Sequence, residues 1–159
     1  MTRAFVTYVR PLLKYASCVW SPYLLKHIKR IESVQKRFTK RLFSISHLGC
    51  LDRLKAIGLE SLELRRLHHD LLCTYKVLFG KLEMDHDGMF LIRSQSTTRG
   101  HSWKLFPKHC HTNVRKHFFC ERVIAPWNCL NINSENLRSI TSFKRLIKGS
   151  DLSAFVHYF

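Results

Sequence analysis

Histidine and cysteine, which often carry catalysis or bind metals, gather in the stretch "KHCHTNVRKHFFC" (108–120). Its donors are His109, Cys110, His111, His117 and Cys120. Structural zinc sites usually show two close ligand pairs at short spacings, whereas this stretch has one close cluster and one looser pair. We therefore interpret it as a basic, partly exposed segment and assign no metal to it.

Carboxylates come closest together in "MDHDGMF", at Asp85 and Asp87. Two-metal nucleotidyl transfer needs carboxylates that converge on two cations, and no Asp pair occurs in a strand-like setting. The two aspartates also begin an EF-hand pattern, but its twelfth position is Ser96 rather than Glu. There is no glycine-rich phosphate loop, and no Cys–His pair is marked as a nucleophile. The sequence predicts a chain with no catalytic residue, no metal, no cofactor and no enzyme activity of its own.

Positive charge is the dominant feature of the composition. The 159 residues hold 27 Lys or Arg against 11 Asp or Glu, a formal net charge of +16. So large an excess repels itself unless a polyanion is near, and nucleic acid is the commonest such partner, with an anionic membrane surface next. Residues 1–45 carry ten of the cations and a single acid, Glu32.

The stretch "KHIKRIESVQKRFTKRLF" (26–43) predicts an amphipathic helix over residues 24–42. Its apolar stripe is Leu24, Ile28, Ile31, Val34, Phe38 and Leu42. On a helix these positions share one face. The opposite face holds Lys26, Lys29, Arg30, Lys36, Arg37, Lys40 and Arg41. A helix face of cations almost without acids is typical of a surface that follows phosphates without reading bases.

Two further groups could contact nucleic acid. Arg99 precedes Gly100, where a backbone turn could present it to a phosphate. Five aromatic side chains could stack on bases, namely Trp20, Tyr23, Phe118, Phe119 and Trp127. They fall in or beside apolar periodicities, so we expect them in the core instead. Trp127 and Asn128 are expected to anchor the last helices, with the indole buried and the amide capping a helix or bound to backbone.

The remaining patterns predict a mostly α fold. Helices are expected over 4–20 with an interruption at Pro11, over 51–58 ending at Gly58, and from a cap at Ser61 to Gly80. Others are expected around 119–130, over 139–149 and over 151–159, with a polar loop at 81–97. Over residues 98–106, apolar and polar side chains alternate in part, which is compatible with a short β hairpin.

Targeting and redox signals are weak. The six cysteines form no CxxC pair, and no apolar run is long enough to be a secretion signal or to cross a bilayer. We expect reduced thiols, mostly small core residues, in an intracellular protein that is nuclear or cytoplasmic and not secreted.

Several blocks together resemble a known family. "VRPLLKYASCVWSPYLLKHIKRIESVQKRF", "RLKAIGLESLELRRLHHDLLCTYKVLFG", "TTRGHSWKLF", "NVRKHFFCERVIAPWNCL" and "SFKRLIKG" occur in the order and near the spacing of the region after the catalytic core in jockey-type non-LTR retrotransposon reverse transcriptases. Cys50 stands where that family usually has Tyr, and Asn131 where it has Pro, which points to a decayed or divergent copy. The resemblance covers nearly the whole chain.

The resemblance implies a fragment of an RNA-directed DNA polymerase. Residues 1–45 would be the end of its thumb and 46–159 a helical C-terminal module, with the catalytic palm upstream. We expect non-specific binding of RNA or DNA backbones, without a membrane or small-molecule ligand. The alternative is a structural or interaction module that packs against the polymerase core. Binding that weakens steeply with salt would favour the first, and a large exposed apolar patch on residues 4–20 the second.

Overall fold

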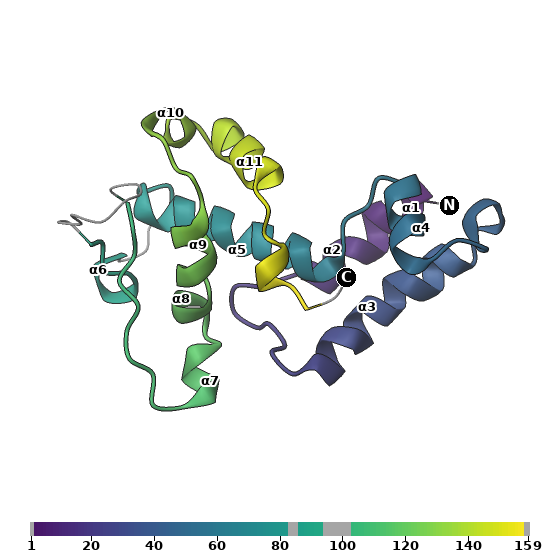
Figure 1. Cartoon of the computed structure of the whole chain (residues 1–159), viewed down its shortest axis with the longest axis horizontal. Coiled ribbons are helices and arrows are strands. Elements are labelled where there is room, and N and C mark those ends of the chain that lie inside the picture. The colour runs from purple at the N-terminus through teal and green to yellow at the C-terminus, as the bar shows by residue number, and fades with distance from the viewer. Residues whose placement is uncertain (1, 83–85, 94–102, 158–159) are drawn as a thin grey trace. The chain divides into compact units, whose positions relative to one another are not determined.

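The computed structural model describes residues 2–82, 86–93 and 103–157, and helices dominate these residues (Figure 1). The mostly α fold class is confirmed. The described chain divides into two compact units. Unit 1 comprises the residues up to Ser17, then Ser21–Arg66, and those from Ser153 onward, whereas unit 2 comprises Cys18–Trp20 and Leu67–Leu152. The division at residue 45, which concerns the organisation of the resembled family, stays a prediction.

Unit 1 is built from short helices around one long one. Its elements are α1 Thr2–Ala4, the π-helix η1 Phe5–Val9, α2 Arg10–Lys14, α3 Leu25–Lys40, the 3₁₀ turn η2 Phe43–Ile45, α4 Cys50–Ala56, the start of α5 Leu62–Leu78, and the 3₁₀ turn η3 Ser153–Phe155. The last element is shorter than the helix expected over 151–159. α4 and η2 both pack against α3.

The N-terminal helical segment ends earlier than the sequence predicts. It stops at Lys14, and residues 15–19 form turns. Pro11 donates no hydrogen bond and crowds the preceding turn, and the π-type bond from the Arg10 amide to the Phe5 carbonyl accommodates it. The extra residue rotates the helix, so Phe5 and Arg10 turn inward while Tyr8 and Leu12 are exposed. A 3.6-residue period predicts one apolar face of Phe5, Tyr8, Leu12 and Ala16, and this prediction was wrong for Tyr8 and Leu12.

The buried face of α3 is more polar than predicted. Its fully buried residues are Ile28, Glu32, Gln35 and Thr39. Of the expected stripe, Ile28 is buried and Ile31, Phe38 and Leu42 are half-buried. Leu24, which precedes the first residue of α3, and Val34, at the edge of the stripe, are exposed, so the prediction was wrong for them. Phe38 stacks on Phe5, with ring centroids 4.0 Å apart.

The predicted ends of α4 and α5 are confirmed. Gly58 and Gly80 adopt left-handed φ values of 64° and 60°. After α5, the Lys81 amide bonds to the Lys76 carbonyl and the Gly80 amide to the Val77 carbonyl, which is a Schellman motif. The start of α5 is also as expected, because the Ser61 hydroxyl accepts from the Leu64 amide at 3.2 Å.

Unit 2 continues α5 and adds short helices. They are α6 His86–Met89, α7 Asn113–Lys116, α8 Phe119–Arg122, α9 Ile124–Cys129, α10 Ser134–Leu137 and α11 Ile140–Gly149. α6 interrupts the loop expected at 81–97. Pro126 lies in the first turn of α9, which explains why the periodic run from Phe119 divides into two helices.

Aromatic side chains of α5, α9 and α11 form the core of unit 2. The rings of Tyr75 and Phe143 stack with centroids 4.7 Å apart, and Trp127 lies 5.5 Å from Phe143. The Trp127 indole donates to the Trp103 carbonyl at 2.8 Å. Asn128 exchanges two hydrogen bonds with the backbone of Leu105. The anchoring role predicted for Trp127 and Asn128 is confirmed.

The hairpin that the sequence left open is reduced, in the described part of the chain, to one isolated antiparallel bridge between Ile92 and Leu105. Residues 98–102 of the expected strand, together with Asp85, lie outside the described residues.

Candidate nucleic-acid interface and a cysteine–histidine–aspartate cluster

All seven basic residues predicted for the interface on α3 are exposed. They are Lys26, Lys29, Arg30, Lys36, Arg37, Lys40 and Arg41, the last being the residue that ends the helix. At 3.6 residues per turn they fall within an arc of about 140° that lies opposite the buried face. The helix therefore presents one continuous cationic surface, which we call the α3 basic face.

Glu32, the one acid of α3, does not neutralise this face. It is 3% exposed and points into unit 1. Its Oε1 accepts from the Glu63 backbone amide at 2.8 Å, in the first turn of α5. A carboxylate at a helix N-terminus satisfies an unpaired amide and complements the helix dipole. The sequence placed Glu32 on neither face, so its role as a capping group is new.

A buried polar network supports Glu32. Arg10 and Gln35 both donate to the Glu60 carbonyl, at 2.6 and 3.0 Å, just before α5 begins. Burial raises the pKa of Glu32 above its ordinary value, although the backbone amides of Glu63 and Leu62 oppose the shift. The network joins α2, α3 and the start of α5 through groups that the hydrophobic pattern does not reveal.

The other predicted contacts have mixed outcomes. Arg99 lies outside the described residues. Of the five aromatics expected in the core, Trp127 is buried and Phe119 is half-buried, but Trp20, Tyr23 and Phe118 are exposed, so the core prediction was wrong for these three. Each of them lies next to a turn or a short helix rather than within a long one, so a periodic pattern does not determine which way it faces.

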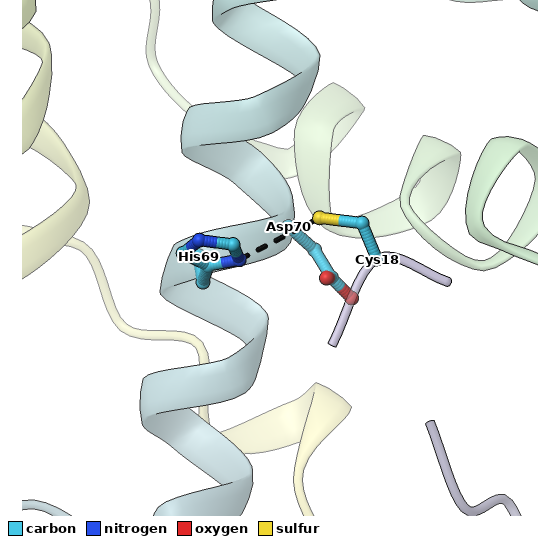
Figure 2. A group of neighbouring side chains, drawn as sticks. All are labelled: Cys18, His69 and Asp70. Atoms are coloured by element: carbon cyan, nitrogen blue, oxygen red, sulfur yellow. Dashed lines mark hydrogen bonds between the residues drawn. The ribbon is translucent and has the colours of Figure 1, made fainter. Parts of the chain in front are cut away.

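Unit 2 contains a cluster of metal-binding side-chain types that the sequence analysis missed. One donor atom each from Cys18, His69 and Asp70 lies within 4.8 Å of the others. Figure 2 shows His69 and Asp70 side by side on α5 with the Cys18 sulfur facing them, 3.5 Å from His69 Nδ1. Cys73 lies one turn further along α5 from His69, and its thiol interacts with that of Cys18, although its sulfur is not among the three close donor atoms. We call these four residues the thiol cluster.

Charge within the thiol cluster is unevenly distributed. The hydrogen bond with Cys73, burial and the nearby Asp70 charge raise the pKa of Cys18. The same hydrogen bond lowers the pKa of Cys73 to about 7. Burial raises the pKa of Asp70, while its ion pair with Arg122 opposes that shift. Of the two thiols, Cys73 is therefore the one that ionises first.

Arg122 holds one side of the Asp70 carboxylate. Its Nε and Nη2 atoms both lie 2.9 Å from Oδ2, and its Nη1 donates to the His117 carbonyl at 3.1 Å. Asp70 Oδ1 is buried and makes no hydrogen bond of normal geometry among the described residues, and the Cys18 thiol is a close neighbour of this carboxylate. Burying a charged oxygen without a good hydrogen bond costs free energy, so this atom is where the cluster would gain most from a ligand.

The stretch 108–120, where His and Cys residues are densest in the sequence, is arranged differently. The rings of His109 and His111 meet edge to face, with centroids 4.8 Å apart. Over residues 2–82, 86–93 and 103–157, the group of three close donors is the one at Cys18, His69 and Asp70. Only the four-residue spacing of His69 and Cys73 could have indicated it, because Cys18 is 51 residues away from His69.

Comparison with known proteins identifies no relative. No protein-family model, no curated protein and no solved structure matches the chain. In the part of the chain that the structure describes, no helix is both long enough and apolar enough to cross a membrane.

Proposed function

We propose that the chain binds RNA or DNA non-specifically, through phosphate contacts made by the α3 basic face. This is the function expected of the end of the thumb in a jockey-type reverse transcriptase, which residues 1–45 resemble. The proposal assigns no catalytic step to the chain. Arg99 is an additional phosphate contact in this proposal.

The observation that carries the proposal is the inward orientation of Glu32. Amphipathic surface helices usually intersperse acids among their cations, which lowers the local potential. On α3, which is described along its whole length, the single acid is withdrawn to cap α5. Seven cations are thus left on the outer face without an acid of the same helix beside them.

The dimensions of the α3 basic face suit a nucleic-acid backbone. From Lys26 to Arg41 the helix rises roughly 22 Å at 1.5 Å per residue. Phosphates follow one another every 3.4 Å along one strand of a duplex, so the face spans about six of them. Contacts of this kind fix position without reading sequence, because every nucleotide carries the same phosphate.

Binding of a fluorescent RNA–DNA hybrid at fixed moderate salt tests the proposal. The parent is compared with a variant in which Lys36, Arg37, Lys40 and Arg41 are changed to Gln. Loss of up to four phosphate contacts is expected to weaken binding by at least about tenfold.

The matched control removes the same charge from unit 2. Arg138, Lys144, Arg145 and Lys148 are exposed on or beside α11, and they are changed to Gln together. If net charge alone drove binding, both variants would lose equally, and that result would contradict an interface on α3. The proposal expects the control to bind nearly as well as the parent.

A second candidate function rests on the first helices. Tyr8, Leu12 and Tyr15 are each more than 70% exposed. Neighbouring exposed apolar side chains of this size favour a buried contact in a larger assembly. The occupant proposed here is the catalytic core of the reverse transcriptase that the chain resembles, against which residues 1–17 would pack.

Mixing the chain with a separately produced catalytic core of a jockey-type reverse transcriptase tests the second candidate. A complex that Leu12→Gln weakens and that Lys36→Gln leaves intact would support it. Failure of the parent chain to bind the core would exclude it.

A further inference from the structure

The thiol cluster has the donor chemistry of a zinc site. Cys18 and Cys73 offer sulfur, His69 offers a ring nitrogen and Asp70 offers a carboxylate oxygen. Zinc in proteins is bound by these three atom types and accepts mixtures of them in a tetrahedron. Two thiolates with an imidazole disfavour magnesium and calcium, which prefer oxygen donors alone.

The spacing of the Cys18 and His69 donors is close to that of a tetrahedral site. With Zn–S at about 2.3 Å and Zn–N at about 2.05 Å, bound sulfur and nitrogen atoms lie about 3.6 Å apart. The Cys18 sulfur lies 3.5 Å from His69 Nδ1, and the carboxylate oxygen lies within 4.8 Å of both. The Cys73 sulfur is outside this group of three, so the proposed site needs a rotation of the Cys73 side chain toward it.

Helix α5 carries two of the donors four residues apart. Residues four apart lie on one face of an α-helix, so His69 and Cys73 project toward the same side of α5. Asp70 is adjacent in sequence, and Cys18 comes from the turn that follows α2 (Figure 2). Ala16 has a left-handed φ of 50° within that turn, two residues before Cys18.

Arg122 completes the arrangement as an outer partner. Metal-bound carboxylates are commonly held by a hydrogen-bond donor on the oxygen that does not bind the metal. Arg122 occupies Oδ2 of Asp70 with two bonds, and the buried Oδ1 makes no hydrogen bond of normal geometry among the described residues. Two thiolates, one carboxylate, a divalent cation and Arg122 also sum to zero charge.

We propose that Cys18, His69, Asp70 and Cys73 bind one Zn²⁺ ion, with Arg122 orienting the aspartate. Four protein ligands leave no open position, so the site is structural rather than catalytic. The exposed His69 ring and the half-buried Cys18 and Cys73 thiols give an ion and a chelator access to the cluster. A bound ion would join the turn at Cys18 to α5 across about fifty residues of sequence and raise the stability of unit 2.

Cobalt titration of the reduced, chelator-stripped chain tests the site directly. Co²⁺ bound by thiolates gives an intense charge-transfer absorption that Co²⁺ bound by nitrogen and oxygen alone lacks. One equivalent of Co²⁺ is expected to give this absorption, and Zn²⁺ is expected to abolish it by displacement. Absorption without the thiolate band would overturn the proposal.

Variants then locate the ligands. Cys18→Ser and Cys73→Ser are each expected to weaken Zn²⁺ binding by about 100-fold or more, since each removes a ligand atom. His68→Asn, at the position before His69, and the pair Cys110→Ser with Cys120→Ser are the matched controls, and both are expected to bind as the parent does. If the Cys110/Cys120 pair loses binding and Cys18→Ser keeps it, the metal lies in the stretch 108–120 and the proposal is wrong.

Thiol labelling of the unaltered chain gives a result even if a variant fails to fold. Saturating Zn²⁺ is expected to slow alkylation of Cys18 and Cys73, located by mass spectrometry, while Cys129, which is exposed, keeps its rate. Equal rates with and without Zn²⁺ at Cys18 and Cys73 would contradict the site. So would a Cys18–Cys73 disulfide that persists under reducing conditions.

Discussion

Arg122 and Asp70 form a largely buried ion pair in which each group depends on the other. The side chains are 17% and 5% exposed. Removing one partner of such a pair leaves an uncompensated charge in the interior. Arg122→Met is therefore expected to lower the free energy of unfolding by about 3 kcal/mol, measured by urea titration with a chelator present so that no metal contributes.

The control for this prediction is the pair formed by Arg115 and Glu121. Its N···O distance is 3.6 Å, and the Arg115 side chain is 49% exposed. Arg115→Met is expected to cost less than about 1 kcal/mol, because solvent screens the pair. Equal losses in the two variants would show that Asp70 is not buried as a charge. Asp70→Asn combined with Arg122→Met should recover part of the loss.

The buried carboxyl of Glu32 makes stability depend on pH. Burial raises its pKa in the folded chain above the unfolded value, so the folded state holds this proton more tightly. The contribution is fully present below the unfolded pKa and is lost as the pH rises through the folded pKa. Glu32→Gln cannot ionise and keeps an acceptor for the Glu63 amide. Its unfolding free energy relative to the parent is therefore expected to increase from about pH 4 to about pH 7.

Urea titrations at several pH values measure this difference. Glu135→Gln, which alters an exposed glutamate of α10, is the control and corrects for the change in net charge. A difference between Glu32→Gln and the parent that stays constant across the range would contradict the role of burial.

For individual residues, the sequence predicted roles that depend on near neighbours in the chain better than roles that depend on distant ones. Ser61 as a cap, Gly58 and Gly80 as helix ends, and Trp127 with Asn128 as an anchor all follow from residue types within a few positions. Glu32 and Cys18 have partners 31 and 51 residues away. A periodic pattern records which face a residue lies on, but it does not record what approaches that face.

Among the elements, α5 has both of its ends determined locally. Gly80 has φ of 60°, and an added Cβ would meet nothing within 4 Å. The cost of Gly80→Ala is therefore conformational rather than steric against neighbours, and it is expected to lower the free energy of unfolding by about 1 kcal/mol.

Gly149→Ala is the matched control for Gly80→Ala. Gly149 ends α11, its φ lies outside the left-handed region, and an added Cβ there also meets nothing within 4 Å. Thermal denaturation of the two variants is expected to show a lower midpoint only for Gly80→Ala. A similar fall for both would show that the left-handed φ at Gly80 is not the cause.

Helices could be predicted from the sequence where one periodic face is buried. The prediction of the buried face failed where the helical period itself changes. The π-turn before Pro11 inserts an extra residue, so a 3.6-residue pattern assigns the wrong face to Tyr8 and Leu12. On α3, Gln35 and Thr39 occupy the buried face with polar side chains bound to Glu60 and Arg53. A hydrophobic pattern cannot show these positions as buried, because their burial depends on hydrogen bonds.

For the whole molecule, the uneven distribution of charge is the feature that the proposed function explains. The formal net charge is +16, and the α3 basic face contributes seven of the cations. The exposed α11 cations belong to unit 2, so the two sets can be altered separately. The number of phosphates contacted is thus open to measurement, because each contact releases a bound counterion.

The salt dependence of binding to an RNA–DNA hybrid is the most direct test of the central claim. If all seven cations contact phosphates, the logarithm of the association constant should fall against the logarithm of salt concentration with a slope of about −6. Changing Lys36, Arg37, Lys40 and Arg41 to Gln should make that slope shallower by up to about 3.6, while the α11 control keeps the slope of the parent. An identical slope for parent and α3 variant, or no binding by the parent, would show that the α3 basic face is only a solvated surface.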